Sequence, residues 1–336
     1  MQFSRIDANS DEQFDAWFGV LQRSEQSRDG ESGQGWHPDE WRARSIDETA
    51  PRYFRLNSYG ASPAAPVAVG ALEVTRDDNL AFIEGNLFVD PDQRRRGYGS
   101  AMLQELERAA HDMGRPTLLI FVIEGPREIG TGPNRLFAVH HGYRVAEENV
   151  RRDLPWPRPD DELEKLWDAW SPLATDYEIV SWTNGTPEDL VEGRAHLSAI
   201  MPAETPHVDI VVEAEHWDAA RVRLHEATTD QMGRDLLVAA ARHRASGELV
   251  GYSELTVSRE QPETVYQWDT LVVRAHRGHR LGGLLKVTTM RLLAAGRYPT
   301  EKITTFNSVL NAPMIAVNES LGARVAGAMV AWRKDL

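Results

Sequence analysis

Residues 94–99 read Arg94-Arg95-Arg96-Gly97-Tyr98-Gly99. Residues 81–89 before them have the pattern of a strand, and a helix pattern follows with Met102, Leu103, Leu106 and Ala110 on one face. A glycine turn between a strand and a helix exposes unpaired N–H groups at the positive end of the helix dipole. Such a turn is suited to a phosphate, because glycine allows close approach and arginine adds charge-assisted hydrogen bonds.

The same order of strand, basic turn and helix occurs again in the second half of the chain. Residues 265–273 are rich in β-formers, and a helix pattern follows the turn Arg274-Ala275-His276-Arg277-Gly278-His279-Arg280-Leu281-Gly282-Gly283. Arg277 lies 183 residues after Arg94, more than half of the 336-residue chain. This spacing predicts two fused copies of one domain, each of ordinary domain size.

Each half opens with a strand and a helix-start signal. Residues 10–13 form a capping-box pattern, and Thr186-Pro187 places an N-cap threonine before a proline suited to the first helical turn. Three prolines within residues 155–159 can continue neither a helix nor a central strand. We therefore expect an N-terminal domain at 1–155, a linker with a short helix at 156–175, and a C-terminal domain at 176–336.

The composition is that of a soluble globular protein, with 41% hydrophobic and 26% charged residues. The sequence shows neither a signal-peptide pattern nor a membrane span, so we expect a cytoplasmic protein without a membrane partner. The absence of cysteine excludes disulfides and a cysteine nucleophile.

A net charge of −14 argues against nucleic acid as a partner and mildly favours an amine-bearing small substrate. No metal is expected, because no acidic ligand has metal-site spacing with His140, His141, His276 and His279.

The turn at residues 94–99 resembles the pyrophosphate-binding motif Q/R-x-x-G-x-G/A of the GNAT superfamily of acyl-CoA N-acyltransferases, and matches it fully. The resemblance implies an α/β (α+β) protein of two tandem GNAT domains, each with a mixed, mostly antiparallel sheet flanked by helices, as in actinobacterial-type members. It also implies acetyl-CoA as cosubstrate. The cofactor residues that it implies are Val89, Arg94, Arg95, Arg96, Gly97, Tyr98, Gly99 and Ser100 in the first copy, and Val272, Arg277, Gly278, Gly282 and Gly283 in the second.

Downstream, the family places a helix of the form N-x-x-A-x-x-x-Y-x-x-x-G-F/Y beside the pantetheine. Residues 311–322 keep its interval from Asn311 to Gly322, and residues 133–143 keep its Gly-Tyr ending. The family's usual acid, the tyrosine, is absent because Ala138 and Asn318 occupy its position. Tyr98 and Tyr143 are nearby candidates in the first copy, although a structural role suits both.

The second copy also departs from the motif, because Arg280 replaces the first motif glycine. Either this copy still binds CoA, with Arg280 turned outward or adding a cationic contact, or it has lost CoA binding. The sequence leaves both alternatives open.

The resemblance implies an N-acetyltransferase in which a primary amine of a small molecule, such as an antibiotic or metabolite, attacks the thioester directly in a ternary complex. The base is normally a carboxylate on the strand before the motif, where Glu84 and Asp269 are the only acids of the two copies. Each is either the base or a structural carboxylate, and Asn311 is a third catalytic candidate. The acceptor pocket is expected at residues 11–46 and 187–227, with a polar cover at 28–35.

Two alternatives stay open for the function. One is a non-catalytic acyl-CoA-binding or regulatory protein, and the other is a mycothiol-synthase-like acetyltransferase. A monomer or a homodimer is expected.

Overall fold

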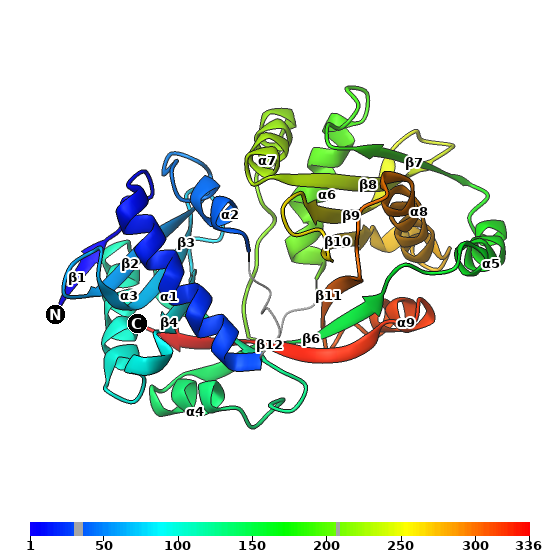
Figure 1. The fold of residues 1–336 in the computed structure, drawn as a ribbon. Coiled ribbons are helices and arrows are strands. Elements are labelled where there is room, and N and C mark those ends of the chain that lie inside the picture. The colour runs from blue at the N-terminus through cyan, green and yellow to red at the C-terminus, as the bar shows by residue number, and fades with distance from the viewer. Residues whose placement is uncertain (30–35, 206–208) are drawn as a thin grey trace. The chain divides into compact units, whose positions relative to one another are not determined.

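The computed structural model describes residues 1–29, 36–205 and 209–336 (Figure 1). Most of the polar loop expected to cover the acceptor pocket therefore lies outside the described residues. The chain divides into two compact units: unit 1 is Met1–Glu148 with Met329–Leu336, and unit 2 is Asn149–Ala328. Among the described residues, no helix is long and apolar enough to cross a membrane.

Unit 1 is built on a mixed sheet. Its strands β1 to β4 pair antiparallel in chain order, and β4 then pairs parallel with β5. The elements in chain order are β1 (Gln2–Arg5), α1 (Asp11–Asp29), α2 (Pro38–Ala43), β2 (Arg52–Gly60), β3 (Pro66–Thr75), β4 (Ile83–Val89), α3 (Tyr98–Asp112), β5 (Thr117–Glu124), α4 (Pro133–His140) and β6 (Arg144–Pro155).

Strand β3 carries the core of unit 1 on both of its faces. Ala68 and Leu72 are buried in a cluster with α3, whereas Val69 and Ala71 are buried in a cluster with Trp17 of α1. Successive side chains of a strand point to opposite faces, so α1 and α3 cover opposite faces of the sheet.

Unit 2 repeats this pairing order. Strands β7 to β10 pair antiparallel in chain order and β10 pairs parallel with β11, so the duplication predicted from the sequence is present in the fold. The elements are α5 (Asp160–Trp170), β7 (Tyr177–Thr183), α6 (Val191–Glu204), α7 (Ala219–Gln231), β8 (Arg234–His243), β9 (Leu249–Ser258), β10 (Thr264–Val272), α8 (Leu281–Gly296), β11 (Lys302–Ser308), α9 (Ala312–Ser320) and β12 (Arg324–Asp335).

The two halves of the chain exchange strands. Residues 149–155 of β6 pair antiparallel with β11 in unit 2, from Asn149 opposite Ser308 to Pro155 opposite Lys302. Conversely, the last residues of β12 lie in unit 1, where Trp332 is buried against α3. The units therefore differ from the expected ranges 1–155 and 176–336, because the alternation of a strand does not encode which sheet it joins.

The expected linker is likewise part of unit 2. Helix α5 packs its apolar stripe, which includes Leu163 and Trp167, into the same core as Val287 of α8. One other local expectation differs: α6 begins at Val191, with Leu190 rather than Thr186 at the cap position. The backbone N–H of Thr186 donates instead to a glutamate of α7.

We expect Trp332→Ala to destabilise unit 1, although Trp332 is the fifth residue from the C-terminus. The side chain is 3% exposed, and truncating a buried tryptophan typically lowers the free energy of unfolding by about 3–5 kcal/mol. Hydrogen exchange should then speed up in α3 and β5 more than in α8 and β11. Leu336→Ala, at a more exposed position of the same chain end, is the control. Equal loss of protection in both units would contradict the assignment of this strand to unit 1.

Candidate functional site

The arginine–glycine turns of the two units have the same backbone conformation. In the unit 1 turn (94–99), φ is 64° at Arg95 and 85° at Gly97, and in the unit 2 turn (277–282) it is 93° at Gly278 and 59° at Arg280. All four values lie in the left-handed region that glycine adopts without strain. Glycine and arginine have exchanged places between the copies, so Arg280 preserves the shape of the turn.

The backbone N–H groups of both turns are available to a ligand. Helix α3 begins directly after Gly97 and α8 directly after Arg280. Within the described part of the chain, the N–H groups of residues 95–100 and 278–282 donate to no protein acceptor. Unpaired amides at a helix start, preceded by left-handed residues, form a concavity that binds anions. Each turn therefore has the main-chain geometry of a phosphate site.

The first arginine of each turn is held by the protein itself. Arg94 Nε donates to the carbonyl of Val89 at 3.4 Å, and its Nη2 donates to hydroxyls near the end of α1 at 2.9 and 3.0 Å. In unit 2, Arg277 Nε donates to the carbonyl of Val272 at 2.9 Å, and its Nη2 pairs with Glu204 at 2.7 Å. These arginines tie the strand end to the end of α1 or α6, so their guanidinium groups are already engaged by the protein.

Two other residues predicted to bind the cofactor also have protein contacts. Ser100 Oγ lies 3.0 Å from Nε2 of His141. A Cβ on Gly283 would lie 2.5 Å from the ring of Trp170, so this glycine permits the close packing of α5 on α8. Arg96 is more weakly engaged, by one hydrogen bond of 3.1 Å to Gln93.

Gly97 and Gly282 are the open positions, whereas Gly99 and Tyr98 have close neighbours. A Cβ on Gly97 would meet no atom within 4 Å, and one on Gly282 would meet only side-chain atoms at 3.9 Å. A Cβ on Gly99 would lie 3.4 Å from a side-chain methyl group of Val89. The side chain of Tyr98 packs toward Tyr59, with ring centroids 5.9 Å apart.

Each turn lies at the end of a strand that separates from its parallel neighbour. In unit 1, β4 pairs with β5 only from Ile83 to Gly85 and then continues to Val89 without it. In unit 2, β10 pairs with β11 as far as Gln267 and continues to Val272. Among the described residues, the pairing of these strands with their parallel neighbours ends at Gly85 and Gln267. Beyond that point the carbonyls of Val89, Val272 and Asp269 accept from side chains, and the other groups on these strand edges are open to an extended ligand that follows the turn.

Glu84 has an environment suited to a base in unit 1. It lies directly opposite Glu73 on β3. Burial and the charge of Glu73 together raise the pKa of Glu84 to about 7. Glu73 itself stays ionised: although burial raises its pKa, Arg44 and Arg52 lower it overall, and Arg44 Nη2 lies 2.7 Å from Glu73 Oε1. One of two facing carboxylates is thus placed to exchange a proton near neutral pH.

Asp269, the matching acid of unit 2, is engaged by a neighbour. It lies in an irregular stretch of β10, where the register with β9 shifts between Gln267 and Thr270. Its Oδ2 accepts a hydrogen bond of 2.8 Å from the hydroxyl of Tyr252. Burial and the nearby Glu254 raise the pKa of Asp269.

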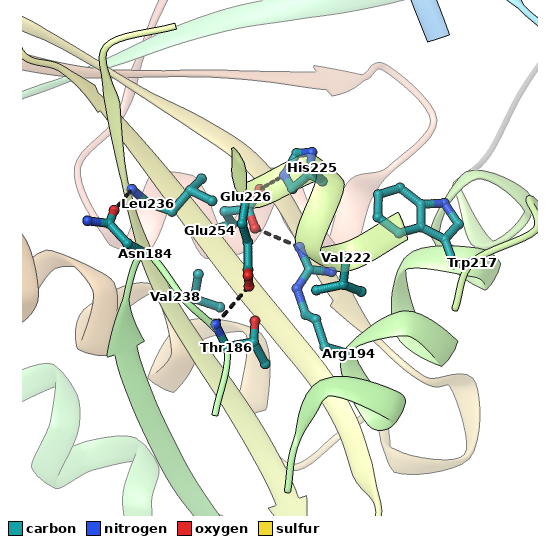
Figure 2. A pocket seen from close by; sticks show the side chains of 10 residues that line it. All are labelled: Asn184, Thr186, Arg194, Trp217, Val222, His225, Glu226, Leu236, Val238 and Glu254. Carbon is teal, nitrogen blue, oxygen red and sulfur yellow. Dashed lines mark hydrogen bonds and ion pairs between the residues drawn. The ribbon is translucent and has the colours of Figure 1, made fainter. Parts of the chain in front are cut away.

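Unit 2 contains a polar pocket that the sequence did not reveal (Figure 2). It lies between α6, α7, β8 and β9, and its free space is about that of one water molecule. Arg194 Nη2 pairs with Glu254 Oε2 at 2.6 Å, and Nε2 of His225 lies 3.8 Å from Oε1 of the same carboxylate. Although burial alone raises the pKa of Glu254, Arg194 and His225 lower it to about 2. The lining residues are Asn184, Thr186, Arg194, Trp217, Val222, His225, Glu226, Leu236, Val238 and Glu254.

At the position that corresponds to Glu254, unit 1 has an aromatic cluster instead of an ion pair. Phe14, Trp17, Trp41 and Phe54 pack in one buried cluster with β3. Ala71 of that cluster lies 183 residues before Glu254, which is the spacing between the two turns. A buried carboxylate in unit 2 thus stands where unit 1 has a methyl group.

The other catalytic candidates have local structural roles. Asn311 caps α9, because its Oδ1 accepts from the backbone N–H of Met314 at 3.3 Å. Tyr143 is buried and donates to Glu107 at 3.1 Å, and burial raises its pKa far above the usual range. At the positions of the missing tyrosines, Ala138 is fully buried and Asn318 is bonded to Asn307.

Residues 64–145, which include the unit 1 turn, match the family model of the acetyltransferase (GNAT) domain. No curated protein sequence matches the chain significantly. A tandem GNAT protein from the clavulanic acid biosynthesis pathway has a similar structure, with a TM-score of 0.76, 23% identity, and coverage of 99% of this chain and 98% of that one. A GCN5-related N-acetyltransferase from Sphaerobacter thermophilus follows with a TM-score of 0.65, 14% identity, and coverage of 99% and 95%.

Lys286 of α8 is a buried lysine with no counter-charge among the described residues. Its side chain is 2% exposed and has no hydrogen-bond or ion-pair partner among the described residues, and burial lowers its pKa to about 7. Leu103, 183 residues earlier, is fully buried at the matching position of α3. An uncompensated buried lysine destabilises the folded state.

We expect Lys286→Leu to stabilise the protein in a pH-dependent way. Between pH 7 and 10.5 the unfolded chain holds a proton on Lys286 that the folded chain has lost, so wild-type stability should rise with pH across this window. A lowering from 10.5 to about 7 corresponds to about 5 kcal/mol. Denaturant titrations across the window should show this slope in the wild type and less of it in the variant. Lys165→Leu, at an exposed position, is the control; a slope that survives in Lys286→Leu would contradict the assignment.

Proposed function

We propose that this chain, a two-domain member of the GNAT superfamily, is an acetyl-CoA-dependent N-acetyltransferase that acetylates a primary amine of a small molecule. The observation that carries the proposal is the duplicated turn: in each unit, unbonded amides begin a helix at the end of a strand that leaves its parallel neighbour. A pyrophosphate fits such amides, and a pantetheine chain is an extended ligand with amides of its own that suits the free strand edge.

In unit 1 the amine would attack the thioester carbonyl directly, with Glu84 as the group that takes up its proton. The carbon–nitrogen bond forms as the carbon–sulfur bond breaks, and CoA leaves as the thiol after taking a proton. Glu84 suits this role because a base is most effective when its pKa lies near the working pH. The cosubstrate would be held chiefly by main-chain amides, since Arg94 is tied to Val89 and α1.

We expect titration calorimetry to find two acetyl-CoA sites, one for each turn, because Arg280 preserves the backbone of the unit 2 turn. Gly99→Glu should remove one site and Gly282→Glu the other, since each places a carboxylate where the pyrophosphate would lie. Gln104→Glu adds the same charge to an exposed position of α3 and should leave both sites intact. The absence of any binding would refute the proposed function. One site, removed by Gly99→Glu alone, would restrict cofactor binding to unit 1.

The role of Glu84 is best tested in the Gly282→Glu background, where unit 1 is the only expected centre. Turnover should rise with pH through about 7, as Glu84 loses its proton. Glu84→Gln should lower kcat by about 10²- to 10⁴-fold, the usual contribution of a general base. Glu73→Gln should shift the rise to lower pH, because Glu73 raises the pKa of Glu84. An unchanged pH profile in both variants would exclude Glu84 as the base.

A second candidate function is acyl-CoA binding without turnover. The observation in its favour is the absence of the family's acid, since Ala138 and Asn318 are buried at its positions. Calorimetric binding at both turns, combined with no release of CoA across a panel of primary amines, would support this function over the acetyltransferase.

A further inference from the structure

We propose that unit 2 binds a CoA thioester whose acyl group ends in a carboxylate, and that Lys286 of α8 supplies the counter-charge. The inference rests on the proposed acetyltransferase function, because it requires that the unit 2 turn holds CoA. It goes further by naming the class of acyl group, which is a short dicarboxylic acid joined to CoA through one of its carboxyl groups. Unit 1 has a leucine at the matching position and would keep the acetyl group.

Lys286 lies level with the part of β10 that separates from β11. Helix α8 runs antiparallel to β10, because Leu285 packs in one cluster with Val272 at the end of the strand, whereas Val287 packs with Val265 near its beginning. Lys286 stands between Leu285 and Val287 and is therefore level with the middle of β10. The pairing of β10 with β11 ends there.

The side chain of Lys286 lies on the β11 side of α8. Gly282 is one helical turn earlier on the same face, and a Cβ there would lie 3.9 Å from Met314 of α9, the helix that follows β11. Lys286 is 2% exposed, so these elements cover it. A thioester that follows the free edge of β10 from the turn would therefore bring its acyl group toward this lysine.

The sheet under this part of α8 is polar in unit 2 and apolar in unit 1. Gln267 of β10 pairs with Thr305 of β11, and both are buried on the face that α8 covers, since the residues two positions earlier pack against α8. Their counterparts in the strand pairing of unit 1 are Gly85 and Ile120. Leu103 of α3 is fully buried with Ile120 in one apolar cluster. Only unit 2 thus offers polar groups to an acyl chain at this level.

Two of these polar groups lack a partner of their own. The amine of Lys286 has no hydrogen-bond or ion-pair partner among the described residues, and Oε1 of Gln267 is a buried acceptor without a donor there. A protonated lysine has three N–H donors, which suffice for a ligand carboxylate and for Gln267 together. The carboxylate also removes the penalty of burying an unpaired ammonium, which an acetyl group cannot do.

The carboxylate should also change the protonation of Lys286. Burial alone lowers the pKa of Lys286 to about 7, and a bound carboxylate raises it again. Binding should therefore take up about half a proton at pH 7 and about one at pH 8.5. The charged groups on the elements packed against α8 have partners elsewhere, and they are Glu164 of α5, Glu178 of β7, Asp235 of β8, Glu254 of β9, Asp269 of β10, Lys302 of β11 and Glu319 of α9.

The carboxylate takes no part in the transfer itself. The amine attacks the thioester carbonyl, and the carbon–nitrogen bond forms as the carbon–sulfur bond breaks. One proton of the ammonium goes to solvent and a second goes to the CoA thiolate, which leaves as the thiol. The product is an amide that carries a free carboxylate.

The test uses the full chain carrying Gly99→Glu, in which unit 2 is the only expected CoA site. Malonyl-CoA and isovaleryl-CoA are compared by titration calorimetry, because their acyl groups have equal numbers of heavy atoms and differ in the carboxylate. At about pH 6.5 malonyl-CoA should bind at least about tenfold more tightly. The preference should shrink toward about pH 8.5, as Lys286 loses its proton. Both thioesters carry the same phosphates, so their titration cancels in the comparison.

Lys286→Met, added to Gly99→Glu, removes the charge and keeps a long side chain. It should reverse the preference, because the malonyl carboxylate would then be buried without a counter-charge. Lys165→Met, at an exposed position of α5, is the control and should retain the preference. Binding enthalpies in buffers of different ionisation enthalpy give the proton uptake without any substitution of Lys286.

The outcomes separate this inference from the proposed function. A preference for malonyl-CoA with proton uptake, both lost in Lys286→Met, supports the inference. Equal binding of the two thioesters, no proton uptake, or a preference that survives in Lys286→Met overturns it and leaves the acetyltransferase function in place. Binding to the unmodified protein but not to the Gly99→Glu protein overturns it as well. No binding of any CoA thioester to the unmodified protein refutes the function and this inference together.

Discussion

Both candidate cofactor sites depend on two left-handed residues in a turn of six. These residues direct the turn so that consecutive N–H groups reach the helix start without acceptors. Glycine adopts this conformation freely, yet each copy contains one arginine in it, Arg95 or Arg280. The fold keeps these arginines left-handed because the turn is fixed at both ends. The strand end is tied by Arg94 or Arg277, and the helix is anchored in the core.

The turns belong to the features that the sequence predicts, because local patterns encode them, whereas contacts between distant residues cannot be predicted in this way. The turns, their flanking strands and helices, and the duplication follow from local patterns, since Gly97 and Arg280 stand between a strand and an amphipathic helix. The exchange of β6 and β12 does not follow, because Trp332 reads as an ordinary buried strand residue in either sheet. The pocket does not follow from the sequence either, because Arg194 and Glu254 are 60 residues apart. The available signal was Glu254 itself, an acid inside the apolar strand β9.

The position of the buried charged groups distinguishes the two copies more clearly than the turns do. At the position of Ala71 unit 1 packs aromatic rings, and its charged groups Glu73 and Glu84 lie further along the strands. Unit 2 instead has the Arg194–Glu254 pair at the matching position. Apolar packing at such a site is often at least as stable as a buried ion pair, so stability alone does not explain the pair. Lys286, at the position of Leu103, is another buried ionisable group in unit 2. Burying these groups in unit 2 lowers the stability of the folded state, and such destabilising groups are typical of functional sites.

The strand exchange links these specialised units in folding. Neither half of the sequence contains all the strands of its own unit, because residues 149–155 complete the sheet around β11 and residues 329–336 complete the core around α3. A gene fragment that encodes one half would therefore leave an unpaired strand edge and an open core. If each domain contained all of its own strands, either one could be deleted, or separated from the other, without leaving the other incomplete. Here neither the polar pocket of unit 2 nor the turn of unit 1 belongs to a domain that is complete without the strand supplied by the other half of the chain.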